Sequence, residues 1–157
     1  MSPNDIVPLA EAIQAKLDAT DSPSPVILIV DDEKIIADTL AAIFNRSGYA
    51  AFAAYDAESA LELAALVSPQ LLITDVVMPV MNGIDLAIRM ESLLPDCRIL
   101  LFSGQASTVD LLASARAMGH NFTTLSKPVH PTELLKRVSE TLQIAKPPQS
   151  AVPILCP

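Results

Sequence analysis

Short apolar runs alternate with amphipathic segments along most of the chain. Continuous apolar runs are typical of strands that are buried on both faces of a sheet. Apolar residues three or four positions apart are typical of helices that pack one face against a sheet. The predicted strands are Val26–Val30, Tyr49–Ala54, Leu71–Thr74, Arg98–Phe102 and Phe122–Leu125, and the predicted helices are Glu33–Arg46, Ala57–Leu66, Ile84–Leu94, Thr108–Met118 and Pro131–Ile144.

Glycine and proline mark the ends of several of these helices. Gly48 and Gly119 stand just after two of them, where glycine commonly ends a helix. Pro95 ends the third helix, and Pro131 stands at the first position of the last one. Five strands that alternate with five helices predict an α/β fold, a doubly wound five-stranded parallel sheet.

The two ends of the chain differ from this pattern. Leu9, Ile13 and Leu17 share a four-residue spacing that suits one stripe of a short helix, and Asp21–Pro25 has the composition of a linker. Lys146–Pro157 is rich in proline. We therefore expect an N-terminal extension over residues 1–25, one domain over 26–144, and a proline-rich tail over 145–157.

Composition narrows the class of protein. With 157 residues, 51% hydrophobic and 18% charged, the chain is expected to fold as one globular domain. Its apolar runs are far shorter than the roughly 20 residues of a membrane span, so no membrane insertion is expected. The net charge of −8, without a cluster of basic residues, argues against direct nucleic-acid binding. Cys97 and Cys156 make no disulfide framework, and with no secretion signal in view a cytoplasmic location is expected.

Polar residues with complementary chemistry follow the first, third, fourth and fifth predicted strands. Asp31 and Asp32 come after the first strand, Asp75 after the third, Ser103 after the fourth and Lys127 after the fifth. Parallel strands end at the same edge of a sheet, and ligands of open α/β folds bind beyond that edge. These side chains are therefore expected to converge.

The predicted cluster suits phosphoryl chemistry. Neighbouring carboxylates raise one another's pKa unless a cation sits among them, and oxygen ligands suit Mg²⁺ or Mn²⁺. Lys127 and Ser103 could bind phosphoryl oxygens. A carboxylate held by the metal ion and by the Lys127 ammonium is a competent nucleophile. Taken alone, Asp31 and Asp32 could instead form a solvated cap of the first helix.

Four motifs, in order, carry a resemblance. "VDDE", "ITDVVMPVMNG", "LLFSG" and "LSKPV" resemble the receiver domain of two-component response regulators, the CheY-like superfamily, over Val26–Ile144. The resemblance implies the flavodoxin-like strand order 2-1-3-4-5. It implies that Asp75 is the phosphoacceptor, that Asp32, Asp75 and the Val77 backbone carbonyl bind Mg²⁺, and that Asp31 acts through a metal-bound water.

The same resemblance assigns roles to the later motifs. Lys127 would contact the phosphoryl group, and Ser103 would turn its hydroxyl toward that group after modification. A cis peptide between Lys127 and Pro128 is implied, and Gly83 would open the helix after the metal loop.

Two departures from the family pattern bear on signalling. Receivers usually carry a switch aromatic three residues before the lysine, but Thr124 occupies that position here and the nearest aromatic is Phe122. Either Phe122 takes the role from a shifted register or the coupling is absent. Val77 and Gln105, at positions that tune dephosphorylation, carry no charge, which predicts a phosphoryl lifetime of minutes or longer.

The function expected from these features is a phosphoacceptor switch rather than an enzyme, apart from self-phosphorylation and autodephosphorylation. Asp75 would accept phosphoryl from a histidine kinase or a histidine phosphotransfer protein, and a downstream protein would read the change. We expect no output domain after Ile144, and therefore a stand-alone receiver, a relay intermediate or the receiver part of a hybrid protein. A homodimer is compatible with the sequence.

Two alternative functions remain open at the level of sequence. A pseudo-receiver scaffold is favoured by Thr124. A Mg²⁺-dependent phosphohydrolase of the haloacid-dehalogenase type would need a second aspartate where this chain has Val77. His120 and His130 lie in predicted loops and are interpreted as exposed residues without ligand partners.

Overall fold

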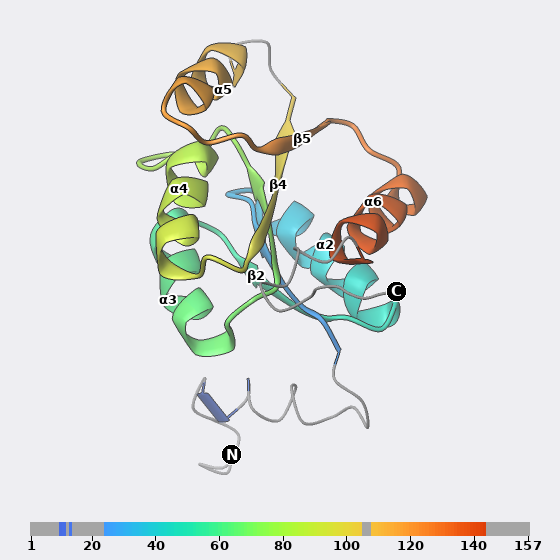
Figure 1. The fold of residues 1–157 in the computed structure, drawn as a ribbon. Helices are drawn as coiled ribbons and strands as arrows, with labels where there is room; N and C mark the ends of the chain where they lie inside the picture. Colours follow the sequence, from blue (N-terminus) through green and yellow to red (C-terminus); the bar gives the residue numbers. More distant parts are fainter. Residues whose placement is uncertain (1–9, 12, 14–23, 105–107, 144–157) are drawn as a thin grey trace, which may run out of the picture.

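The computed structural model describes residues 10–11, 13, 24–104 and 108–143. One five-stranded parallel sheet in the order β2-β1-β3-β4-β5 forms its centre (Figure 1). The predicted α/β fold and strand order are confirmed. The strands are β1 Val26–Val30, β2 Ala50–Ala54, β3 Leu71–Asp75, β4 Arg98–Ser103 and β5 Thr123–Ser126, and the helices are α2 Lys34–Arg46, α3 Ala57–Val67, α4 Gly83–Leu93, α5 Thr108–Ala117 and α6 Pro131–Gln143.

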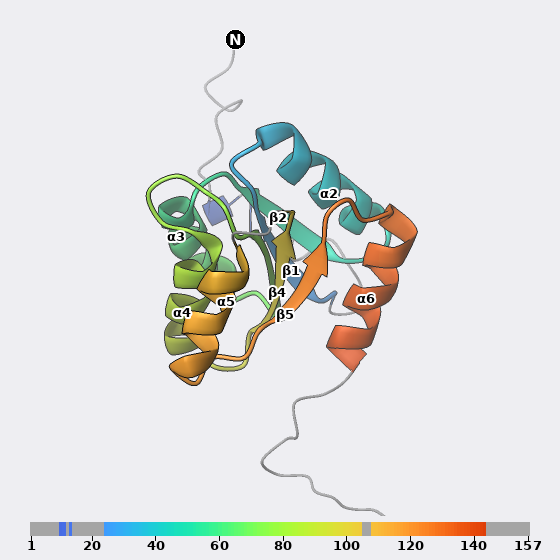
Figure 2. The same ribbon diagram turned by 90° about the horizontal axis from the view of Figure 1, so that it is seen from above.

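Helices cover both faces of the sheet. Seen from above, α3, α4 and α5 lie on one side and α2 and α6 on the other (Figure 2). Strand β1 serves both layers, because Leu28 and Val30 pack in the cluster that includes α3 and α4, whereas Ile27 and Ile29 pack in the cluster of α2 and α6. This double burial explains why the central strands are continuous apolar runs.

The element boundaries agree with the predicted ones to within one residue. Helix α2 begins at Lys34 rather than Glu33, because Glu33 has an extended backbone and serves as the N-cap. Gly48 has φ +99° just past the cap residue Ser47, a conformation that glycine adopts without steric cost. Helix α4 begins at Gly83, one residue before the start predicted from the apolar pattern and at the residue that the resemblance implied.

Part of the predicted N-terminal helix is described. Residues 10, 11 and 13 are helical, and Ile13 is buried at 5% exposure in the same cluster as Leu28 and Ala64. This contact favours packing of the apolar stripe against its own domain. Leu9, Leu17 and residues 145–157 lie outside the described residues, so the division of the chain into three parts stays a prediction. None of the described helices has the length and apolar character of a membrane span.

Candidate functional site

Three carboxylates gather where β1 and β3 end. One ligand oxygen each of Asp31, Asp32 and Asp75 lies within 4.8 Å of the other two. The strands are hydrogen-bonded neighbours with Val30 opposite Thr74, so the residues that follow leave the sheet side by side. The sequence prediction that these acids converge is borne out by this geometry.

Asp31 is a buried member of this cluster rather than a solvated cap. It is 1% exposed, and its Oδ1 accepts a hydrogen bond from the Glu33 N–H at 2.9 Å. The N-cap of α2 is Glu33, which makes no side-chain cap bond within the described part of the chain. The local turn thus fixes the Asp31 carboxylate and leaves Asp32 exposed at the pocket.

Lys127 forms ion pairs with two of the acids, Asp31 and Asp75. Its Nζ lies 3.3 Å from Asp75 Oδ2 and 3.4 Å from Asp31 Oδ2. The Lys127–Pro128 peptide is cis, as expected from the resemblance, and the Lys127 N–H donates to the Ser103 carbonyl at 3.0 Å. Strand β5 is paired with β4 and ends just before Lys127, which brings the ammonium to the same end of the sheet as the carboxylates.

The charges in this cluster shift the pKa values of Asp75 and Lys127. Burial raises the pKa of Asp75, and the nearby Asp31 charge raises it further, while Lys127 acts in the opposite direction. Burial lowers the pKa of Lys127, but Asp75 and Asp31 outweigh this and raise it above its usual value. Among these described residues, three carboxylates face one ammonium, a donor set that fits one divalent cation.

A pocket of about 600 Å³ opens over the acids. It is lined by Asp32, Glu33, Asp75, Val77, Gly104, Lys127 and Pro128. The lining combines acids, an ammonium and the loop backbone after β3. Such a site can hold a small anionic group next to Asp75 if a cation balances the carboxylates.

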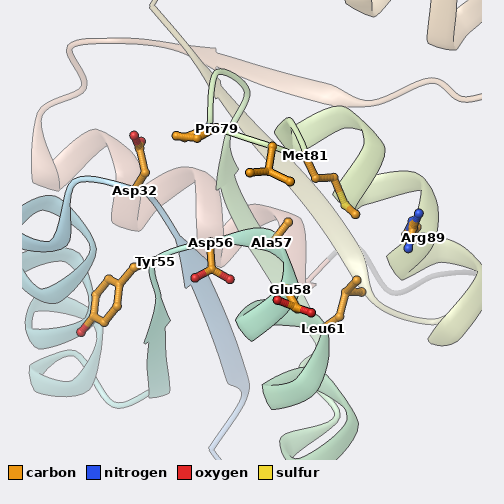
Figure 3. A pocket seen from close by; sticks show the side chains of 10 residues that line it. Asp32, Tyr55, Asp56, Ala57, Glu58, Leu61, Pro79, Met81 and Arg89 are labelled. Atoms are coloured by element: carbon orange, nitrogen blue, oxygen red, sulfur yellow. The ribbon is translucent and has the colours of Figure 1, made fainter.

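A second, more apolar pocket of about 470 Å³ adjoins the first at Asp32. Figure 3 shows it between the connection from β2 to α3 and the loop after β3, with Asp32 and Arg89 on opposite sides. Met81 and Leu61 supply apolar surface, and both pack against the core. The loop after β3 therefore lines both pockets, with Val77 at the polar one and Pro79 and Met81 at the more apolar one.

The family is established by comparison with known proteins. A family model described as the response regulator receiver domain matches residues 27–139. The chain belongs to the response regulator receiver family. It is thus the receiver domain of a two-component response regulator, in agreement with the sequence motifs.

Relatives and solved structures agree with this assignment. The chain is 30% identical over 125 residues to "Response regulator MprA" of Mycobacterium bovis, covering 80% of this chain and 54% of the relative, and 31% identical to that of Mycobacterium leprae with the same coverage. The chain thus spans about half the length of these curated relatives.

Among solved structures, a CheY-like receiver from Methanospirillum hungatei is similar with a TM-score of 0.70 and 29% identity, covering 77% of this chain and 95% of that one. The receiver domain of an HD domain-containing protein from Pseudomonas fluorescens gives a TM-score of 0.70 with 30% identity, covering 77% and 96%. Both neighbours are receivers by their printed names, which agrees with the shared fold.

In this receiver domain neither of the two candidate switch residues is among the described residues that line the pocket over Asp75. Thr124 is exposed on β5. Phe122 packs against the cluster of Val76 and Ala115 and stacks on the His120 ring, with centroids 5.9 Å apart and planes 7° apart. Neither arrangement resembles an aromatic that could rotate toward Ser103, which favours the hypothesis that aromatic coupling is absent.

The sequence interpretation of His120 as an exposed loop residue is wrong. Its ring is partly buried, and Nδ1 lies 2.7 Å from Glu91 Oε1 on α4. The partner is 29 residues away in the sequence, so no local pattern reveals it. His130 is exposed, as predicted.

One polar contact at the site was missed by sequence reasoning. The Ser103 hydroxyl is hydrogen-bonded to the hydroxyl of Thr108, the first residue of α5. Threonine is common at the start of helices, so its presence there does not indicate a contact with the site. Its distinguishing feature, burial against Ser103, is visible only in three dimensions.

Proposed function

We propose that this receiver domain is a phosphoacceptor switch in which Asp75 accepts a phosphoryl group from a phosphohistidine. The observation that carries the proposal is the contact of Lys127 Nζ with Asp75 Oδ2 at the mouth of the acid-lined pocket. This pairing leaves a carboxylate oxygen beside a fixed positive charge, the arrangement that phosphoryl transfer needs.

The transfer is a displacement at phosphorus. An Asp75 carboxylate oxygen forms a bond to phosphorus as the bond from phosphorus to the histidine nitrogen breaks, and that nitrogen keeps the electron pair. Lys127 balances the negative charge of the phosphoryl oxygens, since its raised pKa keeps it protonated at neutral pH. Ser103 supplies a neutral hydroxyl donor at the end of the neighbouring strand.

Asp32, Asp75 and the backbone carbonyl of Val77 would bind Mg²⁺ or Mn²⁺ directly, and Asp31 would act through a water. The three clustered carboxylates support this assignment because they supply oxygen donors and an excess of negative charge. When bound, the cation neutralises charge on the phosphoryl oxygens. The chain's own contribution is to hold Asp31 and Asp75 in place through β1, β3 and Lys127.

The partners follow from this role. A histidine kinase or a histidine phosphotransfer protein would donate the phosphoryl group in the cytoplasm, and a downstream protein would bind the modified form. A phosphohydrolase is less well supported, because the position of a second catalytic acid holds the apolar Val77. The exposed Thr124 keeps the pseudo-receiver as the second candidate.

The test uses the full chain, Mg²⁺ and acetyl phosphate or phosphoramidate, followed by intact-mass measurement. We expect an adduct with the mass of one phosphoryl group in the wild type and in Asp96→Asn, and none in Asp75→Asn. Asp96 is an exposed aspartate just before β4, at the opposite edge of the sheet. No adduct with either donor would favour the pseudo-receiver, and continuous release of phosphate would favour the hydrolase.

A further inference from the structure

Ser103 lies beside the phosphoacceptor pocket without lining it. It is the last residue of β4, pairs with Ser126 on β5, and its carbonyl accepts the Lys127 N–H. Yet the described residues that line the pocket over Asp75 do not include Ser103. Its hydroxyl is instead bonded to the Thr108 hydroxyl.

Thr108 ties α5 to the rest of the domain. It is the first residue of the helix and is 1% exposed. Ala115 is the other buried residue of α5, while Val109 and Leu111 are exposed. The hydroxyl pair is therefore one polar link, within the described residues, between the first turn of α5 and the strand that ends at the site.

We propose that Thr108 is a positioning residue that holds the Ser103 hydroxyl away from Asp75 until Asp75 is phosphorylated. This inference rests on the proposed function. The Ser103 Oγ occupies one rotamer at a time, so contact with Thr108 competes with contact to a phosphoryl group on Asp75. A hydrogen bond to a charged phosphoryl oxygen is stronger than one between two hydroxyls, which sets the direction of the change.

Release of Thr108 gives the signal a direct route to α5. When Ser103 turns to the phosphoryl group, the first turn of α5 loses this hydrogen bond to β4. No rotating aromatic is needed, which agrees with the exposed Thr124 and with Phe122 packed on His120. The change is thus expected first at the N-terminal end of α5.

The test measures binding of beryllofluoride, a phosphoryl analogue, in the presence of Mg²⁺. Thr108→Val keeps the shape of the side chain but removes its hydroxyl, so Ser103 is released and affinity should rise roughly three- to tenfold. Thr108→Ser keeps the hydroxyl and should bind like the wild type. Lower or unchanged affinity in Thr108→Val would overturn the proposal.

A double-mutant cycle separates positioning from structure, because Thr108 makes a further interaction besides the bond to Ser103. In the Ser103→Ala background, Thr108→Val should leave beryllofluoride affinity unchanged. An equal effect with and without Ser103 would show a purely structural role and reject the inference.

Amide hydrogen exchange tests the Ser103–Thr108 hydrogen bond even if Asp75 is not phosphorylated. In the unmodified protein, Thr108→Val should speed amide exchange at the start of α5, and Thr108→Ser should not. If the wild type binds no beryllofluoride and forms no Asp75 adduct, the proposed function fails, and the exchange result still decides whether the Ser103–Thr108 link restrains α5. Equal exchange in wild type and Thr108→Val would rule out the link.

Discussion

Gly83 lies against the backbone of Asp75 so closely that a side chain cannot fit between them. A Cβ built on Gly83 would lie 1.9 Å from the Asp75 carbonyl oxygen and 2.8 Å from its carbonyl carbon. The Gly83 N–H also donates to the Val76 carbonyl at 2.8 Å. Helix α4 is thus packed directly on the end of β3, and this contact fixes the backbone of Asp75.

Gly83→Ala is expected to damage stability and the site together. The added methyl group must push α4 away from β3, since the atom it meets belongs to the backbone. We expect a loss of about 3 kcal/mol or more in the free energy of unfolding, measured by urea denaturation. Formation of the Asp75 adduct should slow in the fraction that remains folded.

Gly119→Ala is the matched control for this prediction. Gly119 has φ +94°, but nothing lies within 4 Å of an added Cβ. The substitution should therefore cost only the left-handed backbone conformation, about 1 kcal/mol, and leave adduct formation unchanged. Equal losses in the two variants would contradict the close contact at Gly83.

Mg²⁺ should stabilise the wild type through Asp32. Because the cation binds the folded cluster and not the unfolded chain, a concentration ten times the dissociation constant should add about 1.4 kcal/mol. Asp32→Asn removes an exposed carboxylate of the cluster and should largely abolish this gain, whereas Asp96→Asn should keep it. Thermal unfolding with Mg²⁺ and with EDTA measures the effect. A gain of the same size in Asp32→Asn would argue against its role as a ligand.

Val80→Asn is expected to stabilise the protein. Val80 has φ +70°, an unfavourable backbone conformation for a β-branched residue, and its side chain is fully exposed. Asparagine tolerates this conformation, so the variant should gain roughly 0.5–1 kcal/mol in urea denaturation.

Val109→Asn is the matched control for Val80→Asn. Val109 is also an exposed valine, but it lies in helix α5, where valine and asparagine have similar propensities. Its stability should change little. A gain of similar size at both positions would mean that polarity, not backbone strain, is responsible.

Val77→Asn should shorten the life of the phosphorylated form. Val77 is partly exposed at the pocket over Asp75 and has no polar group to orient an attacking water. An amide there should speed decay by roughly tenfold or more, measured by following loss of the adduct mass with time. Gln105, the other residue in the sequence prediction of a long lifetime, lies outside the described residues.

Val77→Ala controls for the loss of the valine side chain itself. It opens the pocket without adding a polar group, so its decay should stay close to that of the wild type. A comparable acceleration in Val77→Ala would point to simple access of water. A wild-type half-life of seconds would refute the predicted slow decay.

The sequence by itself determined the layout of this protein and the gathering of its acids. Apolar runs such as Val26–Val30 predict central strands because a parallel sheet covered on both faces buries every side chain of its inner strands. Since parallel strands end at one edge, Asp31, Asp75 and Lys127 were expected to meet there from their chain positions. Periodicity and topology suffice for both conclusions.

Contacts between residues that are far apart in the sequence are visible only in the tertiary structure. The pairing of His120 with Glu91 and the packing of Phe122 on His120 join α4 to the loop before β5. The burial of Thr108 against Ser103 likewise depends on where α5 lies. No periodic pattern in the sequence relates the residues that make these contacts, so the sequence does not predict them. Only the packed fold shows that the Ser103 hydroxyl is bonded to the Thr108 hydroxyl.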